Sequence, residues 1–470
     1  MQSKPFKDLF AIPLRNGLTK PKAVRGAGTK MVNMGELFAN PRMTNVTMDR
    51  VPLNQAERNS SLLAAGDLLF ARQSLVFAGA GKCSIFVNDD EEVCFESHVI
   101  RCRLNRNLAD PDFYFYLFSS FTGRKLIESI VEQGAGASGI RGSDLAELQV
   151  PWVDLAIQIR VAAVLRHLDD KIDLNRRINQ TLEAIAQSIF KSWFVDFDPV
   201  KAKITAIEQG QDPLRAAMRV ISGKTDAELD QMPREHHDQL AATAALFPDA
   251  MEDSVLGEIP KGWTPTPIRD VAEVVKGKSY SSKDLVDNDQ AALVTLKSFE
   301  RGGGFRMDGF KPYVGPYKPE QVVLAGDLIV AYTDVTQAAE LIGKPAVVVG
   351  VDHFKTLVAS LDVGIIRPLN KRVSRQFLYG LFMTDAFQSH TFAHTSGTTV
   401  LHLSKEGVPS YSFACPDERL VSFFSETAEA MAMEKQRLID QNRSLATLRD
   451  ALLPKLLSGE LSVADVEIPA

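Results

Sequence analysis

Two long stretches with a seven-residue hydrophobic repeat constrain the fold of this chain more than any other feature. One covers residues 154–199 and contains "NRRINQTLEAIAQSIFKSWF", and the other covers residues 412–461 and ends in "NRSLATLRDALLPKLLSGEL". A helix of 40 residues is roughly 60 Å long, which exceeds the width of a small domain. We therefore predict that the two helices pack on each other as an antiparallel coiled coil. The alternative is that each helix belongs only to the core of its own domain.

The predicted contact seam of each helix is apolar but contains one Asn at the equivalent place. The seam residues are Val161, Val164, Leu168, Asn175, Ile178, Leu182, Ile185 and Ile189 in the first helix, and Phe424, Met431, Leu438, Asn442, Leu445 and Leu452 in the second. An Asn buried in such a seam lowers stability but fixes the register and the partner of the helices. Asp154 and Asp417 stand where N-caps are expected.

The segments before the two helices repeat each other. The matching pairs, in the same order along the chain, are "FKDLFAI" and "IRDVAEV", "GDLLFA" and "GDLIVA", "FYFYLF" and "FLYGLF", Ser138-Gly139 and Ser396-Gly397, and Val150-Pro151 and Val408-Pro409. Short β-branched and apolar runs separated by Gly, Asn and Asp are typical of mainly β domains. We predict an α+β protein in which two mainly β domains, residues 1–153 and 257–411, occur in tandem. Residues 200–256 are predicted to be an acidic helical linker, and residues 462–470 a tail.

The composition limits the class of protein. A chain of 470 residues is too long for one hydrophobic core. No apolar run approaches the roughly 20 residues that span a bilayer, and the N-terminus does not resemble a signal peptide, so we expect a cytoplasmic protein. The four cysteines lack C-x-x-C spacing, which indicates reduced, buried thiols. The net charge of −6 argues against nonspecific coating of nucleic acid but allows local basic faces.

The motifs that resemble catalytic ones are incomplete. "VFAGAGKCSIF", residues 76–86, contains the F-x-G-x-G pattern of adenine methyltransferases, but the chain has no Asn/Asp-Pro-Pro-aromatic tetrapeptide, and the spacing of a P-loop fails. A self-contained methyltransferase would have to bind S-adenosylmethionine on its own. His236 and His237 are adjacent, which is poor spacing for metal ligands on a helix. We therefore predict no catalytic residues, no metal site and no cofactor bound by this chain.

Binding is the function that remains, and the turns of both repeats carry suitable residues. Glycine allows close approach to a phosphate, while Arg, Lys, Gln and Asn hydrogen-bond to base edges. The candidate DNA-binding residues are Lys20, Lys22, Arg25, Lys30, Arg72, Gln73 and Arg141 in the first repeat, and Lys276, Lys278, Tyr280, Arg301, Arg306, Tyr332, Thr333 and Thr398 in the second. Their occurrence at matching places favours a binding role over chance.

Both long helices, the repeated "GDLLFA" and "GDLIVA", and "SVLGEIPKGW" at Ser254–Trp263 resemble type I restriction-modification specificity subunits over nearly the whole chain. The resemblance implies two target recognition domains, each recognising one half of a split, asymmetric DNA sequence. It also implies that the coiled coil spaces these domains and docks two methyltransferase subunits, with restriction subunits further out. S-adenosylmethionine, ATP and Mg²⁺ would then belong to the partner subunits.

The chain departs from the expected repeat at one place. "IPKGW" precedes the second domain but has no counterpart before the first, which suggests that the first domain lacks its opening strand.

A different class of protein also fits the sequence, namely a coiled-coil scaffold whose β domains bind proteins or glycans. Contacts to several phosphates make affinity fall steeply with salt, so the salt dependence of binding separates the two functions.

Overall fold

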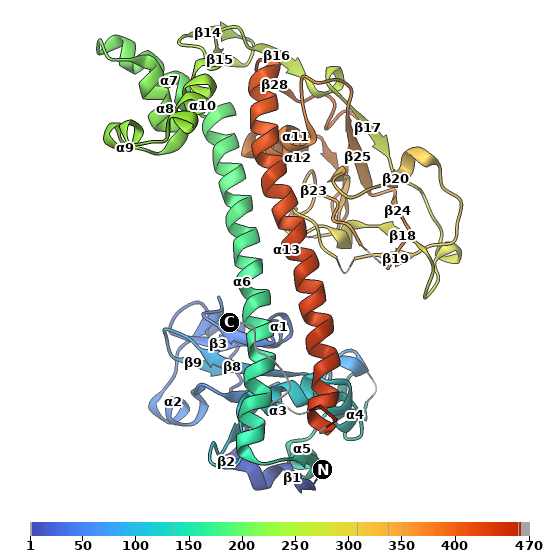
Figure 1. The fold of residues 1–470 in the computed structure, drawn as a ribbon. Helices are drawn as coiled ribbons and strands as arrows, with labels where there is room; N and C mark the ends of the chain where they lie inside the picture. The colour runs from blue at the N-terminus through green and yellow to red at the C-terminus, as the bar shows by residue number, and fades with distance from the viewer. Residues whose placement is uncertain are drawn as a thin grey trace. The chain divides into compact units, whose positions relative to one another are not determined.

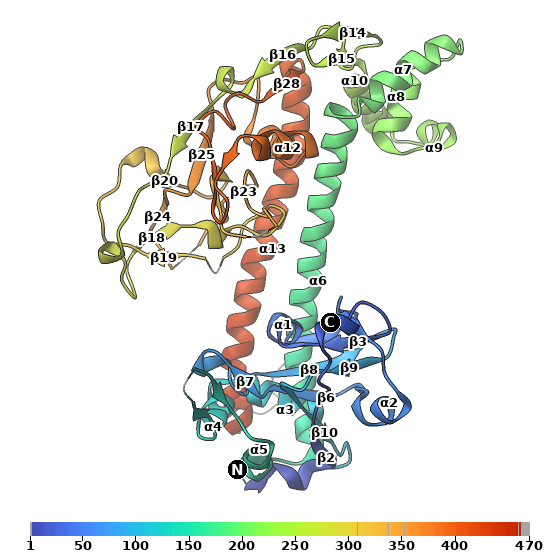
Figure 2. The ribbon, with the colours of Figure 1, turned by 180° about the vertical axis from the view of Figure 1, so that it is seen from behind.

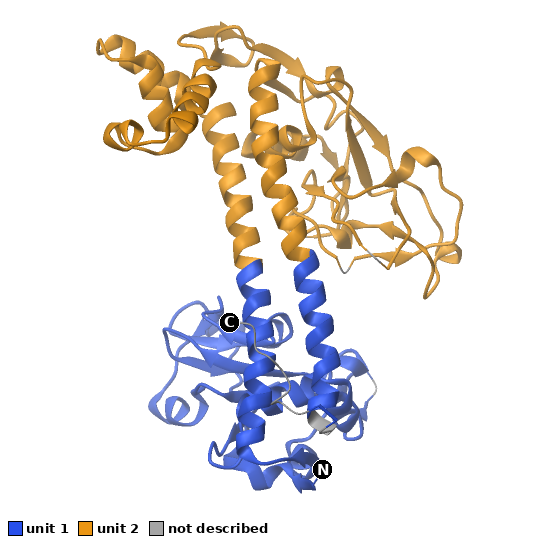
Figure 3. Cartoon of the chain, viewed as in Figure 1, with its two compact units in different colours: residues 1–175, 440–470 blue, residues 176–439 orange. Residues whose placement is uncertain are grey.

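The computed structural model describes residues 2–134, 136–307, 309–336, 338–351, 353–458 and 460–461. It divides into two compact units, residues 1–175 with 440–470 and residues 176–439 (Figure 3). Two long helices, α6 (Leu155–Phe194) and α13 (Glu418–Ser458), run through both units. The predicted tail, residues 462–470, lies outside the described residues.

Both N-cap predictions are confirmed. The carboxylate of Asp154 accepts a hydrogen bond from the Ala156 amide at 3.1 Å, and that of Asp417 accepts one from the Arg419 amide at 2.9 Å. Each carboxylate satisfies an N–H group that has no partner within the first turn of its helix.

The described residues of the first unit form four sheets and five short helices beside the long ones (Figure 1). The sheets, in strand order, are β2 (Phe10–Asn16), β10 (Val99–Leu104), β6 (Asp67–Ala71), β8 (Cys83–Asn88) and β4 (Arg42–Thr44); β5 (Asp49–Val51), β3 (Thr29–Val32) and β9 (Val93–Phe95); β11 (Glu132–Gln133), β12 (Ser138–Gly139) and β7 (Gln73–Ser74); and β1 (Gln2–Pro5) with β13 (Gln149–Trp152). The helices are α1 (Met34–Ala39), α2 (Gln55–Ser61), α3 (Pro111–Ser119), α4 (Phe121–Glu128) and α5 (Gly142–Glu147).

The second unit contains a corresponding set of sheets (Figure 2). They are β17 (Ala272–Lys276), β25 (Val363–Pro368), β21 (Leu328–Ala331) and β23 (Pro345–Val347); β19 (Lys311–Pro312), β18 (Ala291–Val294), β24 (Thr356–Ala359) and β20 (Val322–Val323); β22 (Thr333–Asp334), β27 (Leu401–Leu403) and β26 (Thr395–Ser396); β16 (Thr264–Pro267) with β28 (Ser412–Cys415); and β14 (Met251–Ser254) with β15 (Gly257–Pro260). The helices are α7 (Asp198–Glu208), α8 (Pro213–Ser222), α9 (Asp226–Asp230), α10 (Arg234–Ala245), α11 (Arg375–Phe382) and α12 (Asp385–Ala393).

The strand orders confirm the tandem repeat. The order β2-β10-β6-β8 in the first unit corresponds to β17-β25-β21-β23 in the second, and β11-β12-β7 corresponds to β26-β27-β22. The suggestion that the first domain lacks its opening strand is wrong. Strand β1 pairs antiparallel with β13 as β16 pairs with β28, although "QSKP" and "TPTP" share little sequence.

The repeated Gly-Asp of "GDLLFA" and "GDLIVA" forms the same turn before β6 and β21. Gly66 and Gly326 have positive φ angles of 88° and 84°, a conformation that glycine adopts without strain. The following carboxylate closes the turn: Asp67 accepts a hydrogen bond from the Ala64 amide at 2.8 Å, and Asp327 accepts one from the Leu324 amide at 2.9 Å. The motif therefore recurs because the backbone requires it.

An aromatic core joins each mainly β domain to the long helices. In the first unit, Phe6 and Phe113 pack in one cluster with Val161 of α6 and Leu453 of α13. In the second unit, Phe190 of α6 lies 5.2 Å from Phe377 and 5.5 Å from Phe424, between ring centroids.

The two long helices run antiparallel in each unit. In the first unit, Asp169 pairs with Arg449, and Asn175 pairs with Asn442 further along α6. In the second unit, Glu183 contacts Lys435 and Phe190 contacts Phe424. The partner number falls as the number on α6 rises, which confirms the antiparallel coiled coil.

Most of the predicted seam residues are buried or half-buried. Val161, Val164 and Asn175 are buried, Leu168, Leu182 and Ile189 are half-buried, Phe424 and Leu438 are buried, and Met431, Asn442, Leu445 and Leu452 are half-buried.

The prediction is wrong for Ile178 and Ile185, which are 36% and 42% exposed. A straight helix drifts by about 20° per heptad from a strict seven-residue repeat. The row that starts at buried Val164 has therefore rotated by about 60° when it reaches Ile185 three heptads later. Its place in the seam is taken by the row that contains Leu165, Ile172 and Asn179.

No helix among the described residues is long and apolar enough to cross a membrane. All four cysteines, Cys83, Cys94, Cys102 and Cys415, are buried as free thiols, as the sequence predicted.

Candidate nucleic-acid interface

A small three-stranded sheet in each repeat brings the predicted glycine-rich turns next to the residues that follow "GDLLFA" and "GDLIVA". In the first repeat, Gln73 of β7 lies opposite Gly139 of β12. In the second, Thr333 of β22 lies opposite His402 of β27, which leads back to the turn that carries Thr398. These residues are far apart in the sequence, so the fold creates the candidate surface.

The same backbone crossing supports each surface. A Cβ atom on Gly17 would lie 2.0 Å from the Phe95 carbonyl oxygen, and one on Gly277 would lie 2.0 Å from the Ser360 carbonyl oxygen. Glycine is therefore required at both positions, because only glycine lets the two chain segments approach so closely. In each repeat the residue after this glycine pairs with the opposite segment: Leu18 with Glu96, and Lys278 with Ser360. The "KGKSY" turn of the second repeat therefore corresponds to the segment that begins at Leu18 in the first.

Gln73 and Arg141 are exposed at the surface of the first repeat. Arg141 is 67% exposed and forms an ion pair of 2.8 Å with Glu132. Arg72 is half-buried, and its guanidinium lies 3.5 Å from the Ser97 carbonyl oxygen. The amide of Gln73 and the guanidinium of Arg141 supply hydrogen-bond donors and an acceptor of the kind that base edges and phosphates require.

The predicted cations between residues 20 and 30 are mostly engaged within the protein. Lys20 lies 2.9 Å from Glu57, and Lys30 lies 2.9 Å from Asp89; the two lysine side chains are only 14% and 15% exposed. The hydrogen bond that Lys30 donates to Asp89 raises the pKa of Lys30, and the one that Lys20 donates to Glu57 lowers the pKa of Glu57.

Arg25 pairs with Asp49 at 3.2 Å, while Lys22 lies exposed on a 3₁₀ turn. The structure therefore gives Lys20 and Lys30 a role in holding this loop. Contact of DNA by Lys22 and Arg25 stays a prediction.

The second repeat exposes a different set of groups. Arg301 is 74% exposed and pairs with Glu340 at 3.2 Å. Lys276, Arg306 and Thr398 are also exposed, and Lys278 is half-buried. Tyr280 accepts a hydrogen bond from Lys311 at 3.2 Å.

Two of the candidate DNA-binding residues, Tyr332 and Thr333, are poorly placed to contact DNA because their side chains are half-buried and buried. The Tyr332 ring packs against the backbone at Gly364, where an added Cβ would come within 2.5 Å of it, and burial raises the pKa of its hydroxyl. Thr333 is 7% exposed, and its hydroxyl lies 3.4 Å from Nδ1 of His402. Both side chains turn inward where β21 leads into β22, and they support the surface from beneath.

The sequence prediction missed two exposed aliphatic residues at these surfaces. Leu75 follows β7 and is 89% exposed, and Val335 follows β22 and is 63% exposed. Their equal distance from "GDLLFA" and "GDLIVA" was the feature that could have identified them.

Polar contacts in the coiled coil fix its register. Asn175 is fully buried, and its amide donates to Asn442 at 2.8 Å and to Gln441 at 2.9 Å. These contacts agree with the register role predicted for the seam Asn residues.

Buried carboxylates of α6 hold each recognition domain to the helices. Asp169 accepts hydrogen bonds from Tyr116 at 2.8 Å and from Arg449 at 2.7 Å. In the second unit, the half-buried Glu183 forms hydrogen bonds with Tyr379 of α11 and Lys435 of α13. Burial opposes its ionisation, but Lys435 and these hydrogen bonds keep the pKa of Glu183 below its ordinary value. Such contacts set the orientation of each recognition domain on its helices.

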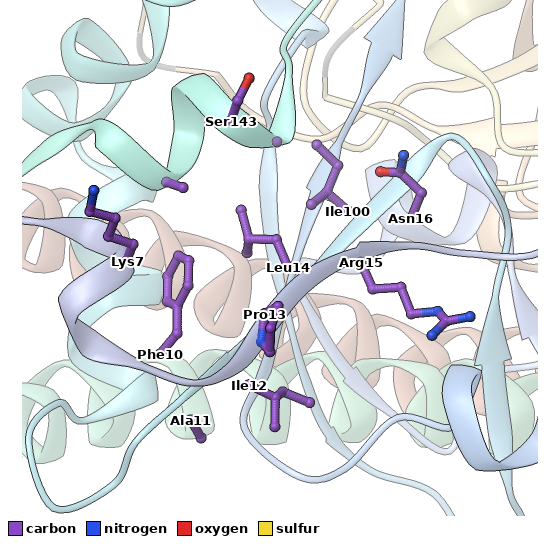
Figure 4. A pocket seen from close by; sticks show the side chains of 12 residues that line it. Lys7, Phe10, Ala11, Ile12, Pro13, Leu14, Arg15, Asn16, Ile100 and Ser143 are labelled. Carbon is purple, nitrogen blue, oxygen red and sulfur yellow. The ribbon is translucent and has the colours of Figure 1, made fainter.

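A pocket of about 710 Å³ lies along the edge strand β2 (Figure 4). Its lining is mixed and includes Lys7, Phe10, Leu14, Ile100 and Ser143. None of the predicted DNA-binding residues lines it. Among the described residues, no group of three or more His, Cys, Asp or Glu side chains is arranged to hold a metal ion.

Known proteins match this chain along most of its length. The family described as the type I restriction modification DNA specificity domain matches residues 1–184. The type I restriction enzyme HindI specificity subunit of Haemophilus influenzae is 28% identical over 413 residues, which cover 84% of this chain and 86% of that protein. The type I restriction enzyme MjaIX specificity subunit of Methanocaldococcus jannaschii is 22% identical and covers 76% of this chain and 70% of its own length. Among solved structures, the S subunit of a type I restriction-modification system from M. genitalium aligns over 97% of this chain and 95% of its own, with 12% identity and a TM-score of 0.49.

Proposed function

We propose that this chain is a specificity subunit of a type I restriction-modification system, and that it recognises one asymmetric, two-part DNA sequence without catalysing a reaction itself. Residues 1–153 would recognise one half and residues 257–411 the other. The observation that carries this proposal is the repeat itself: two domains of the same strand order present matching surfaces with different side chains. Gln73 and Arg141 in one and Arg301 and Thr398 in the other would favour different base pairs.

The length of the helices supports a two-part target. Helices α6 and α13 contain 40 and 41 residues, so each is about 60 Å long. Two half-sites that are one turn of DNA apart are separated by about 34 Å, and those two turns apart by about 68 Å. A spacer of about 60 Å is of the same size as these separations.

The exposed face of α6 supports docking of the methyltransferase subunits. Ile178 and Ile185 lie exposed on it, and a shallow depression is lined by Arg177, Gln180, Thr181, Ala184, Ile185 and Ser188. Two methyltransferase subunits would bind along the coiled coil, with restriction subunits joining the complex through them. S-adenosylmethionine, ATP and Mg²⁺ would be bound by these partners.

Arg141→Ala should weaken binding of the assembled complex at one half of the target only, and Arg301→Ala at the other half only. Loss of a bidentate contact to a base costs about 1–3 kcal/mol and relaxes specificity at that base pair. The measurement is the affinity of each variant complex for duplexes with single base changes in one half-site. If affinity fell equally for target and non-target sequences, these residues would contact phosphates and not bases.

A further inference from the structure

An exposed aliphatic residue stands at the same place in both repeats. Leu75 comes nine residues after Gly66, and Val335 comes nine residues after Gly326; they are 89% and 63% exposed. A single exposed aliphatic side chain is ordinary on a protein surface. Two at one position of a repeat whose surrounding loops have diverged indicate a shared role.

The backbone holds both residues outward by the same device. The hydroxyl of Ser74 accepts a hydrogen bond from the Val76 amide at 3.2 Å, and the carboxylate of Asp334 accepts one from the Thr336 amide at 2.6 Å. In each case the residue before the aliphatic residue accepts a hydrogen bond from the residue after it, which forms a turn with the aliphatic residue at its centre. Asp334 is fully buried and also accepts the amides of Leu341 and Ile342, so one carboxylate anchors both of these residues and Thr336.

The loop after Leu75 is also anchored on its far side. Arg124 donates to the carbonyl oxygens of Ala78 at 3.1 Å and Ala80 at 3.2 Å. The amide of Gly81 donates to the Ala71 carbonyl oxygen at 2.8 Å. The exposure of Leu75 therefore belongs to a preformed turn.

Both residues lie beside the glycine-rich turns of the candidate interface. Ser74 lies opposite Ser138, so the next position, Leu75, adjoins Ala137, which precedes Ser138. Asp334 lies opposite Leu401, so Val335 adjoins the turn at residues 397–400. An aliphatic group among hydrogen-bonding groups matches the major-groove edge of an A·T pair, where thymine presents a methyl group beside its acceptor.

We propose that Leu75 and Val335 each contact the 5-methyl group of a thymine, one in each half of the target. The inference rests on the proposed function and adds specificity-determining residues to it.

The test compares thymine with deoxyuridine, which lacks only the methyl group. The complex with its methyltransferase subunits is titrated with target duplexes in which deoxyuridine replaces the thymines of one half-site. Wild-type affinity should fall about fivefold or more, the effect of a lost base-pair contact. Leu75→Ala should show a similar loss on thymine DNA and no further loss on deoxyuridine DNA in its own half, and Val335→Ala should behave likewise in the other half.

Leu324→Ala is the control, because Leu324 is 67% exposed on a turn outside this interface. Wild-type affinity of the alanine variants for thymine DNA would overturn the inference. Equal losses of affinity by these variants on thymine and deoxyuridine DNA would also overturn it, because the side chain would then contact the DNA somewhere other than the methyl group. If the wild-type complex bound target and scrambled duplexes equally, the proposed function itself would fail.

Discussion

A chain that carries both Ile178→Asp and Ile185→Asp is expected to fold normally but to lose its methyltransferase subunits. DNA methylation by the reconstituted complex should fall by about 100-fold or more, the scale of losing a central apolar contact pair in an interface. The two isoleucines are 36% and 42% exposed on α6, so aspartate at these positions meets water in the isolated chain. In the assembled complex, the same carboxylates would be buried against the partner without compensation.

Ile207→Asp provides the matched control, because Ile207 is 50% exposed on α7, away from the coiled coil. Light scattering after size-exclusion chromatography measures assembly, and thermal unfolding by circular dichroism measures the fold. Normal assembly of the double variant would show that the partners dock elsewhere. A large fall in Tm would show that Ile178 and Ile185 are core residues after all.

Asp67→Ala should destabilise the first recognition domain by about 3–5 kcal/mol, the cost of leaving a partly buried ionic partner alone. The Asp67 side chain is fully buried and pairs with Arg103 through two hydrogen bonds of 2.6 and 2.7 Å. It also accepts the Ala64 amide that closes the turn before β6. The substitution therefore removes an ion pair and a turn contact together.

Asp327→Ala is the equivalent change in the second repeat, and its effect should be smaller, about 1 kcal/mol for the loss of the turn hydrogen bond. Asp327 lies 3.5 Å from Arg375, whose side chain is 48% exposed, so that pair contributes little. Chemical denaturation of the two variants under the same conditions measures the difference. Equal destabilisation by both would mean that the turn, and not the buried ion pair, dominates.

The features that the sequence predicted correctly are those that repeat. The long helices follow from an apolar pattern sustained over many turns, and the tandem domains follow from paired motifs that occur in one order. "GDLLFA" and "GDLIVA" could be matched because the turn and the buried strand require the same residue types. Strand β1 was missed because its sequence, "QSKP", does not resemble "TPTP" of β16, although the two strands pair in the same way with β13 and β28.

The errors occurred where a small rotation changes which side of an element is buried. Ile178 and Ile185 fit a strict seven-residue repeat. An α-helix has 3.6 residues per turn, so residues seven apart drift around the helix axis, and these two lie outside the seam. Tyr332 precedes and Thr333 begins a two-residue strand, which is too short for the sequence to show an alternation of buried and exposed residues. The ion pairs of Lys20 and Lys30 depend on partners distant in the sequence, which no local pattern reveals.

The central claim is that this chain determines one two-part DNA target, and genome-wide mapping of N6-methyladenine tests it most directly. The native strain is compared with a strain that lacks this gene. The account predicts that one methylated motif disappears, with two short specified parts around a fixed unspecified gap. The loss of a single continuous motif, or an unchanged set of motifs in a strain where the methyltransferase partners are active, would contradict it.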